Sequence, residues 1–443
     1  MLVDHLFTGL PTWVQIYFWI VLVIELATFA GVIALLVAGR RYRSLIRRAG
    51  DVDEAEFLWV FLVPALNEEV TIADSIARLR ATTATHAVFL VVDDGSDDRT
   101  GEILGKIDDP RLRVLTRAAP HARQGKAAAL NAAYRMLRQD LLRTPELSRW
   151  TEDRVIVAIV DADGRLASDA PRSVARHLRD QGVGGVQVLV RIYNRRGPLT
   201  WAQDVEFASF GLVFQAGRSW WGVANMGGNG QFNRLSALAS VDDGDGPWRD
   251  RLTEDQDLGV RLVQAGWAGV HDNDIAIDQQ GLNSLRRLYR QRTRWAQGNW
   301  QALGLLRGVL RPKLPLLGRI DTAFYLVTPL LQLMTGIAFA TSIVLAIAWG
   351  TAYNPAVWWV LIFFVGVSFG PGLVTLVIRG GRWYSPVVAL VEIIPYTIYS
   401  WLTFPVLAIS LVRQLAGRTS WVKTARESIE DPRDPTGEVT PVG

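Results

Sequence analysis

The sequence of 443 residues contains no cysteine. This absence excludes disulfides, thiolate nucleophiles and metal sites with cysteine ligands. The sequence also lacks a large excess of basic residues, because its formal net charge is only +4. This charge balance does not suggest a nucleic-acid-binding protein. No low-complexity tract and no long internal repeat is apparent, which argues against a solenoid or a disordered linker protein.

Hydrophobic residues make up 49% of the chain and charged residues 20%, a balance typical of a soluble domain joined to a few membrane spans. Trp13 to Ala38 is almost continuously apolar and is long enough to cross a bilayer. Five arginines follow it between residues 40 and 48, whereas Asp4 precedes it. A cleaved signal peptide would have the opposite charge order. The pattern predicts an uncleaved anchor with the next domain in the cytoplasm.

Three further apolar segments, at about Asp321–Trp349, Ala356–Ile378 and Pro386–Val412, are expected to span the membrane. Glu25 lies in the middle of the first span and is expected to face other helices, because a charged group in lipid is costly. One span before the domain and three after it would place the end of the chain outside. Four basic residues between 413 and 426 favour the cytoplasm instead. The sequence leaves this conflict open.

From Phe57 to about Asp278, short β-branched runs alternate with helical patterns. Continuous apolar strands in such an alternation predict a mainly parallel sheet covered on both faces. Ligands of these sheets bind at the carboxyl ends of the strands, and acidic residues gather there in this sequence.

Two of these strand ends carry paired carboxylates, at Asp93-Asp94 and at Asp161 and Asp163. Paired carboxylates repel each other unless a cation or a donor-rich ligand offsets the repulsion. The second pair has the spacing to hold Mg²⁺ or Mn²⁺ and to leave coordination sites for a diphosphate. The alternative is that both pairs only cap turns.

Two other polar sites follow strands. Asn67 and Glu68 end the first strand and are suited either to bind a nucleoside or to cap the next helix. Lys126 opens a helix after Gly125, where an anion would be favoured, although a solvated lysine would look the same.

A glycine-rich loop contains Gly228, Asn229 and Gly230. Its glycines would let the backbone approach a sugar, and a tight turn near the membrane is the competing interpretation.

The helix that begins with Glu254 and Asp255 supplies the candidate general base, Asp255. Its neighbour Glu254 and partial burial would raise the pKa of Asp255. A simple helix cap beginning at Thr253 is the alternative.

The run from Gln291 to Trp295 places Gln291, Arg294 and Trp295 on one helical face, beside Arg292. Arg294 would bridge phosphate oxygens and Trp295 would offer a plane to an acceptor sugar. A basic helix at lipid headgroups would have a similar composition.

Together the motifs DDGS at 93–96, GKAAALN at 125–131, DAD at 161–163, TED at 253–255 and QRTRW at 291–295 resemble those of the processive family-2 membrane glycosyltransferases, the cellulose, chitin and hyaluronan synthases. The resemblance implies a GT-A fold, Rossmann-like with a mainly parallel sheet, plus an α-helical transmembrane region. It also implies inverting transfer by a single displacement. One N-terminal span, where several relatives have two or more, is a departure from the pattern.

The resemblance further assigns roles to the residues. It places Asp255 and Glu254 in catalysis and a Mg²⁺ or Mn²⁺ ion at Asp163 and Asp161. The acceptor would contact Gly228, Asn229, Gly230 and Trp295. The nucleotide sugar would contact Asn67, Glu68, Asp93, Asp94, Lys126, Asp161, Gln291, Arg292 and Arg294.

The expected function is extension and export of a β-linked polysaccharide from UDP-glucose or UDP-N-acetylglucosamine. Two alternatives stay open: transfer of one sugar to a lipid, and nucleotide-sugar binding without catalysis. The expected partners are the UDP-sugar, a glycan or lipid acceptor and membrane lipids, with no nucleic acid and any export partner unknown. The expected location is the plasma membrane.

The expected domains are an anchor at 1–45, a GT-A domain at 55–280, interface helices at 281–320, three membrane segments at 321–413 and a polar tail at 414–443.

Overall fold

The computed structural model describes residues 10–48, 50–310, 315–349, 358–380 and 385–418. The predicted alternation is confirmed, because each apolar run forms a strand and its ends carry the predicted polar turns. The strands are β1 (Leu58–Ala65), β2 (Ala87–Asp93), β3 (Leu112–Thr116), β4 (Val155–Ile159), β5 (Arg165–Leu166), β6 (Val183–Ile192), β7 (Gln231–Arg234) and β8 (Ala268–Gln279).

The eight strands form one sheet in the order β3-β2-β1-β4-β7-β6-β8-β5. β1 to β4 are parallel, whereas β7 runs antiparallel to β4 and β6. The loop that enters β7 therefore lies at the edge where β4 ends. This reversal brings the glycine-rich loop at 227–230 to the acidic turn at 161–163, because both lie at the same edge of the sheet.

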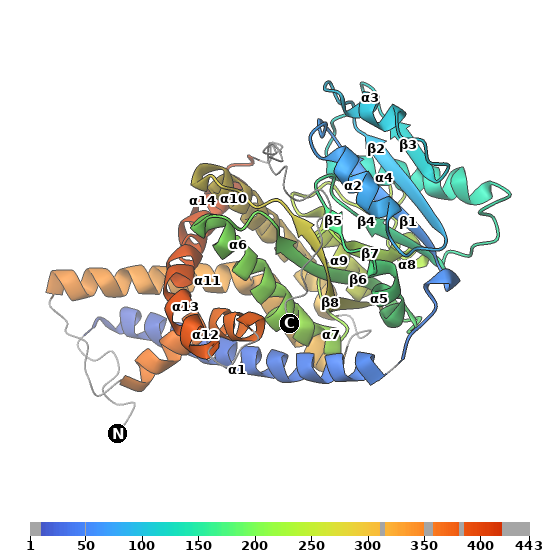
Figure 1. The fold of residues 1–443 in the computed structure, drawn as a ribbon. Coiled ribbons are helices and arrows are strands. Elements are labelled where there is room, and N and C mark those ends of the chain that lie inside the picture. The colour runs from blue at the N-terminus through green and yellow to red at the C-terminus, as the bar shows by residue number, and fades with distance from the viewer. Residues whose placement is uncertain (1–9, 49, 311–314, 350–357, 381–384, 419–443) are drawn as a thin grey trace.

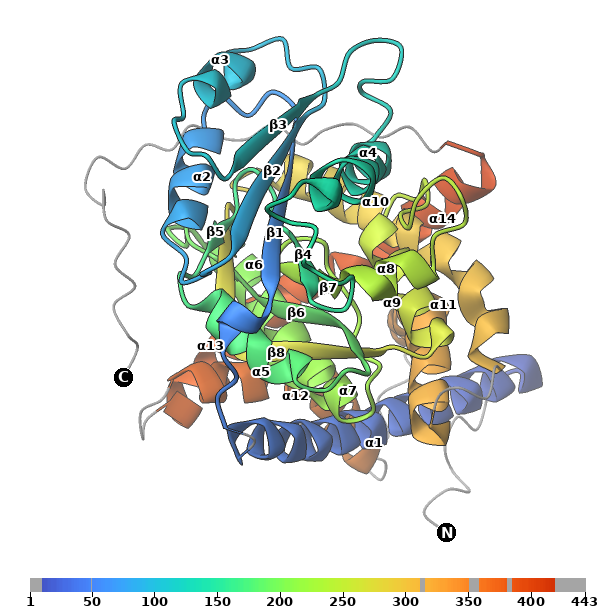
Figure 2. The same cartoon turned by 90° about the vertical axis from the view of Figure 1, so that its right-hand side faces the viewer.

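Helices cover both faces of the sheet, and each face has its own apolar core (Figure 2). One core packs Trp59 and Phe61 of β1 with α2 and α5, and the other packs Leu58 and Leu62 with α4, α8 and α9. Successive β1 side chains thus point to opposite faces, as expected of a strand buried on both sides.

The helices of this part are α2 (Ile72–Arg80), α3 (Thr100–Gly105), α4 (Lys126–Gln139), α5 (Ala170–Leu178), α6 (Pro198–Ser209), α7 (Ala216–Trp220), α8 (Leu235–Ser240), α9 (Glu254–Ala265) and α10 (Leu285–Ala302), with shorter helices η1 (Glu54–Glu56), η2 (Leu141–Arg143), η3 (Phe210–Gln215) and η4 (Leu303–Leu310).

Long apolar helices lie on one side of this domain (Figure 1). They are α1 (Thr12–Arg48), α11 (Leu316–Trp349) and α12 (Trp358–Gly380). Glu25 of α1 is buried and accepts a hydrogen bond from Thr335 Oγ1 of α11 at 2.7 Å, so the prediction that it faces other helices is confirmed. Within the described residues, three stretches are long and apolar enough to cross a membrane: Thr12–Arg48, Leu316–Leu345 and Ser385–Leu415.

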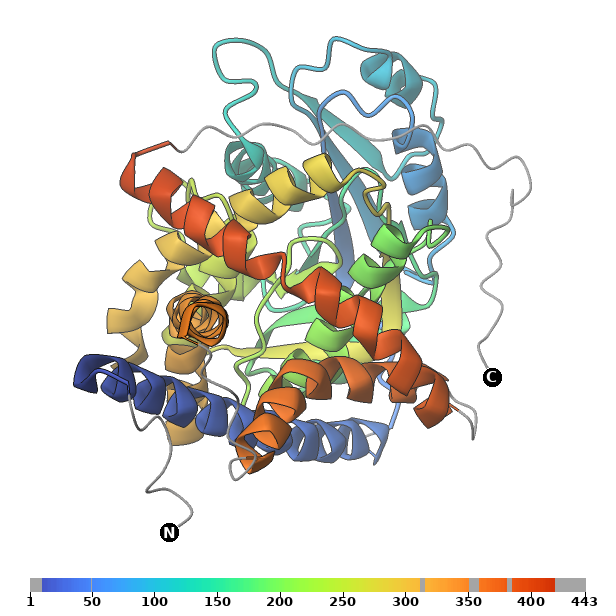
Figure 3. The same ribbon diagram turned by 90° about the vertical axis from the view of Figure 1, so that its left-hand side faces the viewer.

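The last of these stretches is two helices rather than one, α13 (Ser385–Ser400) and α14 (Thr403–Leu415). Their lengths of 16 and 13 residues are each below the roughly 20 residues that a crossing needs. Both run across the direction of α11, which is seen end-on in Figure 3. Spanning helices are tilted by only about 20° on average, so α11 and the pair α13–α14 would not both stand upright in one bilayer.

If α13 and α14 lie along the surface while α11 and α12, of 34 and 23 residues, both cross, residue 418 lies on the same side of the membrane as the sheet. The absence of cysteine makes the test direct, since single cysteines need no background substitutions. We expect Arg418→Cys to react with an impermeant maleimide only in inside-out vesicles, like the exposed Ser148→Cys on the catalytic domain. Labelling of the two positions from opposite sides would show that α13 and α14 cross the membrane.

Candidate active site

A single cavity of about 850 Å³ begins at the carboxyl ends of the strands and continues between the apolar helices. Of the predicted site residues, it is lined by Glu68, Asp94, Lys126, Asp161, Asn229, Glu254, Asp255, Gln291, Arg294 and Trp295. Chain segments separated by more than 200 residues meet here because the sheet edge and α10 close the cavity from two sides.

Lys126 is the first residue of α4, and its ammonium group links two acidic motifs. Nζ lies 2.7 Å from Asp161 Oδ1 and 3.8 Å from Glu254 Oε1. Burial alone would lower the pKa of Lys126, but the carboxylates of Asp161 and Glu254 outweigh burial and raise it. Lys126 therefore stays charged and offers a cation to a diphosphate.

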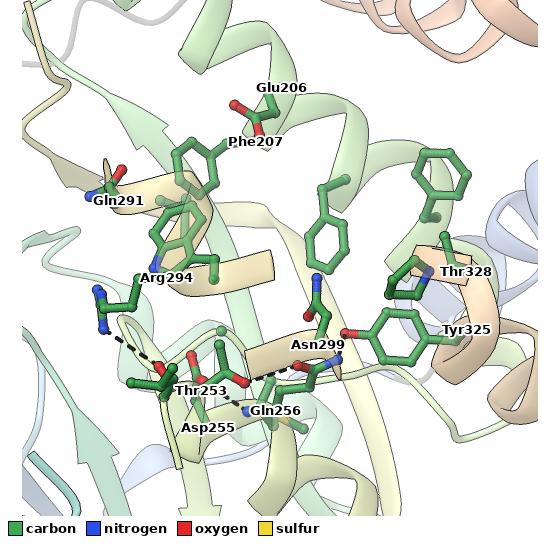
Figure 4. A pocket seen from close by; sticks show the side chains of 18 of the residues that line it. Glu206, Phe207, Thr253, Asp255, Gln256, Gln291, Arg294, Asn299, Tyr325 and Thr328 are labelled. Carbon is green, nitrogen blue, oxygen red and sulfur yellow. Dashed lines mark hydrogen bonds between the residues drawn. The ribbon is translucent and has the colours of Figure 1, made fainter. Parts of the chain in front are cut away.

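Asp255 lies in the first turn of α9 against the glycine-rich loop (Figure 4). Its Oδ1 accepts a hydrogen bond from the Gln256 amide at 2.8 Å. Gly228 has a φ of +78°, and a Cβ added there would lie 2.8 Å from Asp255 Oδ2. The bare Gly228 backbone thus leaves room for the carboxylate of Asp255.

Burial raises the pKa of both Glu254 and Asp255, although the charge of Lys126 opposes the shift. A raised pKa makes a carboxylate a stronger base, which suits the general-base role predicted for Asp255. The two adjacent carboxylates share the cation Lys126. Glu254 lies nearer to this cation, which leaves the role of general base to Asp255.

Helix α10 presents Gln291, Arg294 and Trp295 to the cavity, as the helical spacing predicts. Arg292 is not among the lining residues and contacts Glu206 instead, with Nη2 2.6 Å from Oε2. Its guanidinium group also lies 4.2 Å from the centre of the Trp295 ring. The geometry places Arg292 beside the Trp295 ring, and its contact with a nucleotide sugar stays a prediction.

The polar residues that follow β1 and β2 also differ in whether they line the cavity. Asp94 lines the cavity and pairs with Arg117 at 2.5 Å, whereas Asp93 accepts a hydrogen bond from the Ser96 amide and caps its turn. Asn67 exchanges hydrogen bonds with Asp97 outside the cavity. Asp93 and Asn67 thus hold turns beside the cavity, and their contacts with a nucleotide stay predictions.

The DAD turn also presents only one of its carboxylates. Asp161 lines the cavity and its amide donates to Asn229 Oδ1 at 3.0 Å. Asp163 is buried and is not among the lining residues, and neither are Gly228 and Gly230. Gly230 packs against Val188 and Ile277, so this glycine shapes the loop.

Several lining residues belong to none of the predicted motifs. Tyr325 of α11 accepts a hydrogen bond from Gln256 Nε2 at 3.1 Å, which places a residue of a membrane helix one side chain away from Asp255. Phe210 and Phe214 line the cavity from η3, a π-helical turn between α6 and α7. Such turns are common at functional sites. No local sequence signal marks them, because their position depends on how α7 and η3 pack against α1.

Acidic strand ends, a partly buried lysine and an arginine-bearing helix around one cleft are the arrangement of a glycosyltransferase of the GT-A class. Residues 59–298 match the family model described as "Glycosyltransferase like family 2", and the chain belongs to this family.

Among the curated relatives, the chain is similar to beta-monoglucosyldiacylglycerol synthase of Trichormus variabilis, with 31% identity over 54% of this chain and 48% of the relative. It is also similar to poly-beta-1,6-N-acetyl-D-glucosamine synthase of Staphylococcus aureus, with 28% identity over 57% of each. The chain thus spans about half the length of the curated relatives it matches. In fold it is similar to a mannosyltransferase of Pyrobaculum calidifontis in complex with GDP-Man and Mn²⁺, with a TM-score of 0.55, 20% identity, and coverage of 90% of this chain and 99% of that one.

The residues fit a divalent cation of the hard, oxygen-preferring kind. No group of three or more acidic or histidine side chains is positioned to hold a metal within the described ranges. Mg²⁺ is usually held by only one or two carboxylates together with substrate phosphates, so a preformed cage is not required. Asp161 offers one carboxylate to the cavity, beside the lysine that would face the same diphosphate.

Proposed function

We propose that the protein transfers one hexose from a UDP-sugar to a membrane lipid, with inversion at the anomeric carbon. The observation that carries this proposal is the shape of the cavity. It is lined at one end by Asp161 and Asp255 and at the other by Glu25, Thr28 and Thr335 of the membrane helices. An acceptor held among α1 and α11 would reach the base without leaving the bilayer.

The wall near the membrane suits an acyl chain. Phe210, Phe214, Phe324 and Phe404 line it, and aromatic and aliphatic walls gain free energy by excluding water from a lipid tail. The total volume of about 850 Å³ falls within the range of small-molecule sites, roughly 300–1,000 Å³. This size suits one donor sugar and part of one acceptor better than a long glycan.

In the proposed reaction, Asp255 accepts the proton of the acceptor hydroxyl, whose oxygen attacks the anomeric carbon as the bond to the UDP oxygen breaks. Lys126 and Arg294 line the cavity, where they would face the negative charge that develops on the diphosphate. Such prepositioned cations stabilise a transition state more than a ground state. Trp295, held by Arg292 and Phe207, would support the sugar ring. When bound, a divalent cation at Asp161 would supply further charge neutralisation to the leaving diphosphate.

Extension of a β-linked glycan, the first expectation from the sequence, is the second candidate. It is favoured by the similarity to the poly-beta-1,6-N-acetyl-D-glucosamine synthase. The similarity to the beta-monoglucosyldiacylglycerol synthases, of 30–31% identity, and the acyl-compatible wall favour the lipid.

The two candidates predict different products. We expect purified protein in lipid nanodiscs to transfer label from UDP-[³H]glucose or UDP-[³H]N-acetylglucosamine into a product that extracts into organic solvent. Label that stays at the chromatographic origin and is released by a glycan hydrolase would reject the lipid proposal. The control reaction receives the solvent alone, without the added acceptor lipid.

A further inference from the structure

One end of the cavity lies at the acidic turns, where the UDP-sugar would bind, and is called the donor end. The other end lies among the membrane helices and is called the acceptor end. The positive charge of the cavity lies mainly at the donor end. Three cationic residues line it among those the structure describes: Lys126, Arg294 and Arg218. The first two lie beside the acidic turns, as described above. Arg218 of α7 is the one near the membrane helices, so the state of its charge decides what kind of acceptor head group this end accommodates.

The charge of Arg218 is already compensated. Its Nε donates to Asp321 Oδ2 at 2.8 Å, and its guanidinium group lies 4.6 Å from the centre of the Tyr325 ring. Arg218 is 5% exposed, so the pair is shielded from water. A phosphate would have to share Arg218 with the carboxylate of Asp321, which already offsets its charge and would repel a second anion.

A second carboxyl group lies deeper among the membrane helices. Glu25 lines the same cavity and is hydrogen-bonded to Thr335. The lining residues of α1, α7 and α11 thus include two carboxyl groups, of Glu25 and Asp321, and one arginine. This balance disfavours an anionic head group.

The acceptor end instead presents a hydroxyl donor. The Tyr325 oxygen accepts from Asn225 Nδ2 at 2.6 Å and from Gln256 Nε2 at 3.1 Å. A phenol oxygen with both acceptor positions used donates its own proton elsewhere, and Tyr325 lines the cavity. Its partner Gln256 follows Asp255 in the chain, so an oxygen held by Tyr325 would lie near the base.

We infer that the acceptor is a lipid with an uncharged, hydroxyl-bearing head group rather than a lipid phosphate, and that Tyr325 positions it. This inference rests on the proposed function. The attacking nucleophile is then an alcohol, whose proton Asp255 must remove. A phosphate acceptor would be ionised already and would need no base.

The test compares two acceptors in the same nanodiscs, diacylglycerol and a polyprenyl phosphate, each with one labelled UDP-sugar. We expect diacylglycerol to give at least tenfold more organic-soluble product. More product from the polyprenyl phosphate would overturn the inference while leaving lipid transfer intact. Product only as glycan polymer would overturn the proposed function itself.

The position of Tyr325 is tested by Tyr325→Phe. We expect KM for diacylglycerol to rise about fivefold to tenfold, the size of one lost hydrogen bond, with kcat changed much less. Tyr134→Phe, on α4 outside the cavity lining, is the matched control. An unchanged KM, or equal losses in kcat and in binding of the UDP-sugar, would remove Tyr325 from acceptor positioning.

Discussion

Asp255→Asn is expected to lower kcat by about 10²–10⁴-fold, the usual contribution of a general base. The amide has nearly the same shape as the carboxylate but cannot accept the proton of the acceptor hydroxyl. Binding of the UDP-sugar should change little, because in the proposed reaction the diphosphate contacts Lys126 and Arg294 rather than Asp255. The measurement is transfer rate at saturating donor and acceptor, with donor binding followed by calorimetry.

Asp250→Asn is the matched control, since Asp250 is exposed and lies in the same loop region before α9. The pH profile gives an independent readout. Burial raises the pKa of Asp255, so its neutral form persists to higher pH, and activity should be lost as pH falls, at a midpoint above the ordinary carboxyl value of about 4. Turnover above one tenth of wild type in Asp255→Asn would reassign the base.

Gly228→Ala is expected to lower kcat by about 10²-fold, because small displacements of reacting groups have effects of this size. The added Cβ would lie 2.8 Å from Asp255 Oδ2, too close for any side-chain contact, and φ at this residue is +78°. Both effects move the loop and the carboxylate apart. Donor KM should change less than kcat, since Gly228 does not line the cavity.

Gly227→Ala is the control for an added methyl group in the same loop, at a residue that itself lines the cavity. A Cβ there would meet Gln187 Oε1 at 3.6 Å, an ordinary contact. Equal activity of the two variants would mean that the loop does not fix Asp255. Thermal unfolding of both variants separates a loss of catalysis from a loss of folding.

The sequence by itself was enough to predict a mainly parallel sheet between helices, because strand and helix periodicities depend on neighbouring residues. It did not predict the antiparallel strand β7, which follows the glycine-rich loop. The order of motifs also identified the glycosyltransferase family, and the family match over residues 59–298 confirms it. Apolar length predicted α1 and α11, and the cost of a charge in lipid correctly predicted that Glu25 faces other helices. The roles of individual site residues stay predictions.

Only the tertiary structure decided which of the motif residues share a cavity. Asp93 and Asp94 are adjacent in the chain, yet one caps a turn and the other lines the cleft. On α10, Arg294 likewise lines the cavity, whereas Arg292 is not among the lining residues and contacts Glu206. The direction of a side chain at the end of an element is set by contacts with distant segments, such as Glu206 for Arg292. The contribution of Tyr325 and the size of the cavity could not be predicted from the sequence either. Helices from both ends of the chain must pack together before that space exists.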